Sequence, residues 1–206
     1  MVIWLLQACT SLHSLQGAKT IEPETWEVAL GASLQQNNTL SLATTFPVPQ
    51  SVLSVRYGWK PHLDVGTQVY FGGGLIDVRY QFAQMGDWYF AVAPTIGGLY
   101  AGVYGNVDFR LPLRAQTDLN DKWSMTLGVT PMTQQTLIRV EPMQETLVNS
   151  HLGTTLRLER QGKRVRWGFT TDVVGNMGRA APISLNYGMD MSWVRQKKTT
   201  QTEQTD

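Results

Sequence analysis

The chain has 206 residues, enough for one domain with a core or for a closed barrel. Its 17 basic and 16 acidic residues leave a formal charge of +1, which gives no reason to expect a nucleic-acid partner. Charged residues make up 16%, against about 25% in soluble domains. No stretch reaches the roughly 18 apolar residues of a membrane-spanning helix, so entry into a bilayer would require a closed β-barrel.

The single cysteine, Cys9, follows a short apolar leader at residues 1–8 and cannot form an internal disulfide. The stretch Leu6-Gln7-Ala8-Cys9 resembles the lipobox of bacterial lipoproteins, and the resemblance implies that Cys9 is the lipidated mature N-terminus. The leader is truncated, because it lacks the basic residues and the full apolar length of a secretory signal. A chance cysteine is the alternative. Residues 9–23 would form an N-terminal periplasmic segment.

Alternation with a period of two dominates the rest of the chain. One face of each run is apolar and aromatic, and the other is small or charged. Each run has about ten residues, the length of a tilted strand that crosses the hydrocarbon layer. We therefore predict an all-β, antiparallel, up-and-down barrel of about ten strands over residues 24–194. The runs lie at residues 26–34, 53–60, 63–71, 76–82, 88–96, 106–114, 123–129, 152–159, 165–173 and 183–193.

Alternation alone does not say which face is outside, because a soluble barrel alternates too. The tryptophans of the apolar face decide this point. If the strands run alternately up and down, six tryptophans fall at the same rim. Aromatic rings concentrate at membrane–water interfaces, so this set predicts an aromatic girdle and an apolar face that meets lipid. The girdle residues are Trp26, Trp59, Trp88, Trp123, Trp167 and Trp193.

The connections between the runs support the same orientation. Those at the tryptophan rim are short, whereas residues 35–47, 131–149 and 175–182 form longer loops at the other rim. Short periplasmic turns and longer external loops are typical of outer-membrane barrels. Residues 195–206 are too polar to build a core and are predicted to be a disordered tail.

Together these features resemble a bacterial outer-membrane β-barrel with a lipoprotein-like N-terminus. The likeness is one of pattern and matches no specific family, so it implies only the fold and a location in the bacterial outer membrane. The partner it implies is outer-membrane lipid. A protein partner could bind through residues 35–47, residues 131–149 or the C-terminal tail.

The inward positions carry charges of both signs. Barrels of about eight strands are filled by side chains, whereas those of sixteen or more leave a channel. We therefore predict a lumen closed by paired charges, because unpaired buried charges are costly. A narrow, weakly selective pore is the alternative. The predicted network comprises Glu27, Arg56, Asp64, Asp77, Arg79, Asp108, Arg110, Arg157, Glu159, Arg166, Asp172 and Asp190.

Enzyme motifs are absent from the sequence: it has no phosphate-binding loop, nucleophile elbow or paired-cysteine metal site, so we expect no cofactor, no metal and no catalytic residue. The favoured function is structural anchoring or protein interaction. An outer-membrane hydrolase is the remaining alternative, and it depends on one pair. A two-residue turn at Gln161-Gly162 would place His151 opposite Asp172, where the carboxylate could orient the imidazole for general-base work.

Overall fold

The computed structural model describes residues 16–37, 48–101, 104–140, 143–162, 165–177 and 184–195. These residues include no helix long and apolar enough to cross a membrane. They form twelve strands, all paired antiparallel: β1 (Trp26–Asn37), β2 (Val48–Lys60), β3 (Leu63–Tyr70), β4 (Gly73–Met85), β5 (Trp88–Val92), β6 (Thr95–Ala101), β7 (Tyr104–Arg110), β8 (Leu113–Asn120), β9 (Trp123–Val140), β10 (Met143–Gln161), β11 (Val165–Asn176) and β12 (Ser184–Arg195).

Two pairs of these strands are single barrel strands interrupted by proline. Pro94 separates β5 from β6, which both pair with β4, and Pro112 separates β7 from β8, which both pair with β9. Proline has no N–H to donate to a ladder, but its carbonyl still accepts. Ala93 N donates to Pro112 O at 2.9 Å, so the neighbouring strands stay joined across the breaks.

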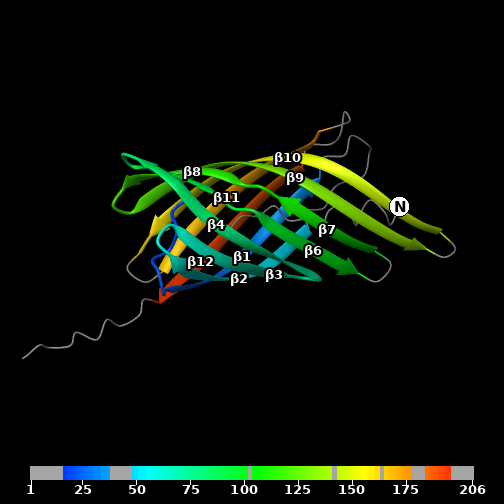
Figure 1. The fold of residues 1–206 in the computed structure, drawn as a ribbon, viewed down its shortest axis with the longest axis horizontal. Coiled ribbons are helices and arrows are strands. Elements are labelled where there is room, and N and C mark those ends of the chain that lie inside the picture. Colours follow the sequence, from blue (N-terminus) through cyan, green and yellow to red (C-terminus); the bar gives the residue numbers. More distant parts are fainter. Residues whose placement is uncertain are drawn as a thin grey trace, which may run out of the picture.

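The sheet closes on itself because β1 pairs with β12 on one side and with β2 on the other. Every barrel strand therefore lies beside its neighbours in the sequence, around a tilted cylinder (Figure 1). The prediction of a ten-stranded, antiparallel, up-and-down barrel is confirmed, and each of the ten predicted runs overlaps one barrel strand.

The two faces of the sheet differ sharply in exposure. On β1, Leu30 is 52% exposed whereas its neighbour Ala29 is 3% exposed, and the same alternation recurs around the barrel. Large apolar side chains thus point outward, and buried polar ones point inward. This is the reverse of a soluble barrel. It is the arrangement of a barrel whose outer surface meets hydrocarbon.

The apolar outer band has two clear edges. Its lower edge is the rim that holds the six tryptophans: Trp26, Trp88 and Trp123 begin their strands, Trp167 lies near the start of β11, and Trp59 and Trp193 lie near the ends of β2 and β12. On β9 and β10 its upper edge is at Pro131 and Leu152, which are paired. Above them most outward side chains are polar, such as Thr133, Gln135 and Ser150, although Val148 is also exposed there.

The predicted loop at residues 131–149 is wrong. The strands β9 and β10 continue through it, and Val140 pairs with Met143 near the tip (Figure 1). In the hairpin the apolar residues are adjacent in the chain, as at Leu137–Ile138 and Leu147–Val148, so the period of two that marked the other strands is missing there. The loop predicted at residues 35–47 begins later, because residues 35–37 belong to β1. Residues 38–47 lie outside the described part of the chain.

A thiol-labelling experiment tests the orientation. Cysteines replacing Glu145 near the hairpin tip and Asp121 at the tryptophan rim both occupy exposed positions. In a Cys9→Ser background we expect an impermeant maleimide to label Glu145→Cys on intact cells. Asp121→Cys should react only after the outer membrane is permeabilised. The opposite pattern would show that the tryptophan rim faces outward.

Candidate functional site

The lumen holds the side chains that could carry a function. Alternate residues of each strand point into it, and most of them are polar and buried. Every residue of the predicted charge network occupies such an inward position, and all of them except Asp172 take part in an ion pair. The pairs form three groups on different parts of the wall.

The first group spans β2, β3 and β4. Arg56 pairs with Asp64 and Asp77, and the second arginine, Arg79, reaches Asp64 at 2.6 Å. Asp64 is fully buried and also accepts a hydrogen bond from the backbone N–H of Ile21 at 3.1 Å. Two guanidiniums and one amide thus compensate the burial of this carboxylate.

The second group lies across β10, β11, β12 and β1. Arg157 donates two hydrogen bonds to Asp190, at 2.5 and 2.9 Å, and one to Glu159 at 3.1 Å. Arg166 continues the chain of charges, because it pairs with Glu27 at 2.7 Å and with Glu159 at 3.6 Å. The group therefore ties four neighbouring strands together on the inside, at the seam where β1 meets β12.

Each of these first two groups is built around an arginine whose side chain lies against a glycine of the next strand. A Cβ at Gly66 would overlap the guanidinium of Arg56, and a Cβ at Gly168 would overlap that of Arg157. Both glycines lie on the small or charged face of their predicted runs. In the barrel they provide the space that lets a guanidinium lie along the wall and reach carboxylates on other strands.

The third group is a single pair on β7, where Arg110 donates to Asp108 at 2.9 and 2.8 Å. Asp172 differs from the rest of the network. It accepts one hydrogen bond, from the hydroxyl of Thr155 at 2.6 Å, and its other oxygen has no hydrogen-bond partner within the described parts of the chain. Asn186, its neighbour on β12, is also buried without one.

The predicted pairing of His151 with Asp172 is wrong. In the β10–β11 ladder His151 lies opposite Asn176, and Thr155 lies opposite Asp172. The ladder ends at Gln161 and Arg166, and Gly162 N donates to Val165 O at 3.0 Å, so the turn is longer than the two residues assumed. The longer turn shifts the register by four residues and removes the geometric basis of the hydrolase hypothesis.

Sequence patterns did not anticipate the contents of the lower lumen. Residues 16–22, here called the lumen segment, lie inside the barrel at the tryptophan end. The chain crosses the rim where Glu24 N donates to Gly58 O at 2.8 Å, and it then enters β1. At the other end of the segment, the side chain of Gln16 reaches Asp77 on β4 at 2.9 Å. The segment has no hydrophobic period, so only the tertiary contacts show where it lies.

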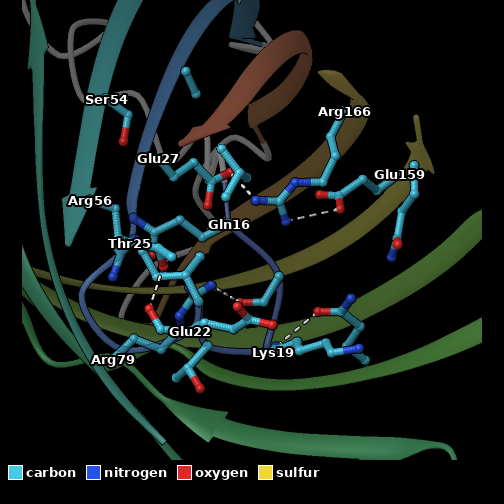
Figure 2. Close-up of a pocket in the computed structure, with 17 residues that line it drawn as sticks. Gln16, Lys19, Glu22, Thr25, Glu27, Ser54, Arg56, Arg79, Glu159 and Arg166 are labelled. Atoms are coloured by element: carbon cyan, nitrogen blue, oxygen red, sulfur yellow. Dashed lines mark hydrogen bonds and ion pairs between the residues drawn. The ribbon is translucent and has the colours of Figure 1, made fainter. Parts of the chain in front are cut away.

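A cavity of about 280 Å³ remains beside the lumen segment, as Figure 2 shows. Its far wall carries Arg166 with its partners Glu27 and Glu159. On the side of the segment it is lined by Lys19 and Thr20. The lining is charged with both signs, and the described residues contain no cluster of three or more His, Cys, Asp or Glu that could hold a metal ion.

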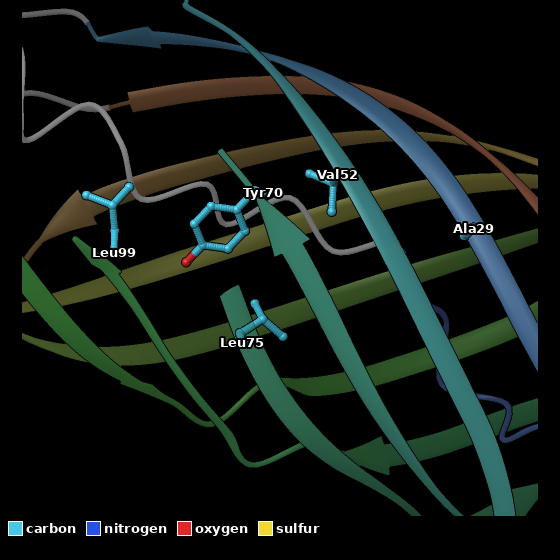
Figure 3. Close-up of a cluster of buried hydrophobic side chains, with 5 residues drawn as sticks. All are labelled: Ala29, Val52, Tyr70, Leu75 and Leu99. Carbon is cyan, nitrogen blue, oxygen red and sulfur yellow. The ribbon is translucent and has the colours of Figure 1, made fainter. Parts of the chain in front are cut away.

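The opposite end of the lumen is partly apolar. Val52, Tyr70, Leu75 and Leu99 are buried on the inner wall of β2, β3, β4 and β6 near the β3–β4 turn (Figure 3). The hydroxyl of Tyr70 donates to Gly98 O at 3.2 Å. These side chains contact one another, so apolar packing and not ion pairing fills the lumen along this part of the wall.

Comparisons with known proteins give the fold and no family. No family model matches the chain, and no curated protein matches its sequence. Among solved structures the chain is similar to Ail, the attachment invasion locus protein of Yersinia pestis (TM-score 0.43, 8% identity, 84% of this chain and 100% of that one). It is also similar to Neisserial surface protein A (TM-score 0.41, 12% identity, 82% of this chain and 96% of that one). A third similar structure is the outer membrane protease OmpT of Escherichia coli (TM-score 0.43, 5% identity, 87% of this chain and 100% of that one).

These similarities are weak and concern the barrel fold. The membrane-spanning character follows from the chain itself, because an apolar outer band, an aromatic rim and a polar buried interior are the features of outer-membrane barrels. The barrel fold and its membrane-spanning arrangement are as predicted, and the expected location is the bacterial outer membrane.

Proposed function

We propose that this outer-membrane barrel is a sealed anchor, which holds surface-exposed elements for protein interaction and does not conduct solutes. The observation that carries the proposal is the content of the lumen. Ion pairs line its wall, and the lumen segment occupies its lower part. Both remove the continuous water path that a channel needs.

Planar-bilayer recording tests the sealed lumen. We expect the full-length barrel to show no discrete conductance steps. A full-length variant in which residues 18–21 are replaced by proline loses the four backbone donors that the wall accepts, and we expect it to show small steps. Steps of equal size in both proteins would contradict the proposal and favour the narrow-channel alternative, which the cavity beside the segment supports.

We further propose that Cys9 is lipidated, on the strength of the lipobox-like Leu6-Gln7-Ala8-Cys9. Residues 1–15 lie outside the described part of the chain. From Gln16, the seven residues back to Cys9 span up to about 25 Å.

Mass spectrometry of the N-terminal peptide tests the lipid. We expect acyl chains on Cys9 of protein purified from membranes, and an unmodified thiol there would end the hypothesis. Cys9→Ser should leave the barrel folded, because the apolar band already anchors it, and should mainly change targeting. Heat-modifiability on gels reports the folding of the variant.

The surface proposed for a protein partner is the β9–β10 hairpin above the apolar band, together with residues 38–47. The C-terminal tail follows β12 at the tryptophan rim, so it is a separate candidate on the other side of the membrane. On the hairpin, Val148 is 60% exposed although it lies beyond the lipid-facing region. A photo-crosslinker at Glu145 should capture a partner at the cell surface, whereas one at Leu127, which faces lipid, should not. Equal capture from both positions would argue against a specific surface.

A further inference from the structure

The wall of the lower lumen binds the lumen segment mainly through its backbone. Gln116 Oε1 accepts hydrogen bonds from Ala18 N at 2.8 Å and from Lys19 N at 3.0 Å. Two further amides are bound in the same way: Thr20 N donates to Gln81 Oε1 at 3.3 Å, and Ile21 N to Asp64 Oδ2 at 3.1 Å. Inward side chains of the wall thus accept hydrogen bonds from four consecutive backbone amides.

One carbonyl of the segment is bound as well. Arg79 Nη1 donates to Gly17 O at 2.9 Å. This arginine and Asp64 also pair with each other, so their positions are set by the wall and not by the segment. A receptor of this kind is preorganised, because its groups keep their geometry when the bound chain leaves.

The wall also selects side chains at the inner end of the segment. The side-chain amide of Gln16 donates to Asp77 at 2.9 Å and accepts from Arg114 at 3.0 Å. The wall thus offers this amide one acceptor and one donor. A carboxylate or an alkyl chain at this position could not bind both. The structure gives Arg114 no carboxylate within ion-pair distance among the described residues, so this amide is its hydrogen-bond partner.

The next two positions accept only small residues. A Cβ at Gly17 would overlap the carboxamide of Gln116, which is held by its two hydrogen bonds. Ala18 is completely buried. On the wall, a Cβ at Gly58 would overlap the carbonyl of Glu22, so the receptor leaves room for a chain where the segment crosses the rim.

We propose that the lower lumen is a binding site for a peptide that contains the pattern Gln-Gly-small, and that residues 16–22 are its resident ligand. A peptide of this pattern supplied by another protein chain at the tryptophan rim would take the same place. The site is defined by contacts with the wall, so the inference goes beyond the sealed-anchor function and does not depend on whether the lumen conducts.

Displacing the resident segment requires a variant, because a tethered ligand has an effective concentration in the millimolar range. Gly17→Trp in the full-length chain cannot fit beside Gln116 and should expel the segment. Asp121→Trp is the size-matched control, because Asp121 is exposed at the tryptophan rim and lies outside the segment. Ala18→Leu is a milder second variant, for use if Gly17→Trp does not fold.

The ligand is a synthetic peptide with the sequence of residues 16–25, labelled with a fluorophore after Thr25 so that the dye stays at the rim. In fluorescence anisotropy we expect the Gly17→Trp barrel to bind it at least tenfold more tightly than the Asp121→Trp barrel. A peptide N-methylated at Ala18 and Ile21 keeps every side chain but loses two donors, and it should bind about tenfold more weakly.

Two results would overturn the inference. Binding of the N-methylated peptide as tight as that of the parent would show that the backbone is not what is recognised. Equal binding to the Gly17→Trp and Asp121→Trp barrels, with both shown folded by heat-modifiability, would show that the peptide does not enter the segment's site. Neither result bears on the conductance of the wild-type barrel, so this inference and the sealed-anchor proposal fail separately.

Discussion

Replacing Leu127 by arginine is expected to lower the free energy of unfolding in lipid vesicles by about 2–4 kcal/mol. Leu127 points outward from β9, four positions above the rim residue Trp123, and is 44% exposed. Its ladder partners are Ala115 and Leu156. The site therefore faces the middle of the hydrocarbon layer, where a guanidinium loses its hydration without gaining a partner.

Gln135→Arg is the matched control for this experiment. It lies on the same strand and the same face, above the apolar band, and pairs with Val107 and Val148. We expect it to change stability by less than about 1 kcal/mol, because the cost of a charge falls toward the interface. Denaturant titration of barrels refolded into vesicles measures both. Equal effects at the two positions would contradict the membrane boundary inferred from the outward side chains.

The second large effect is expected inside the lumen. Arg157→Ala should destabilise the barrel by about 3–5 kcal/mol, because it leaves buried carboxylates without their cation. Arg157 is 1% exposed and donates to Asp190, Glu159 and the hydroxyl of Thr170. Those partners lie on three strands, so the loss is expected to loosen the wall from β10 to β12.

A combined variant separates the ion pairs from simple packing. Adding Asp190→Asn and Glu159→Gln to Arg157→Ala removes the uncompensated charges, and we expect it to recover more than half of the lost stability. Arg160→Ala is the control on the same strand: this residue is exposed and only lies over the ring of Trp123, at 6.0 Å. It should cost less than about 1 kcal/mol. No recovery in the combined variant would mean that Arg157 acts through its volume.

How far the sequence predicts this protein can be seen from β1 and β9. On β1 the alternation of Trp26, Val28 and Leu30 with Glu27 and Ala29 identified both the strand and its two faces, because side chains on a strand point to opposite sides with a period of two. On β9 the same reasoning stopped at Pro131. Beyond the lipid both faces carry polar residues and the few apolar ones are adjacent in the chain, so the strand continues without the contrast of period two that a sequence pattern could detect.

The charge network shows the same division. A period of two determines that Arg56, Asp64 and Arg157 point inward, and burial then requires that they find partners. It does not determine which partner each one takes, because that choice depends on strand register. The register depends in turn on the length of each turn, and the longer turn after Gln161 is enough to separate His151 from Asp172.

By itself the sequence therefore determined the fold class, the number of strands, the lipid-facing surface and the membrane location. These follow from periodicity and from aromatic residues at one rim, which are local properties of the chain. The tertiary structure alone decided three other things: the ion-pair partners, the length of the β9–β10 hairpin and the position of residues 16–22 in the lumen. Each of these depends on contacts between residues far apart in the sequence, such as Gln16 with Asp77 and Arg114, which form only when the barrel closes around them.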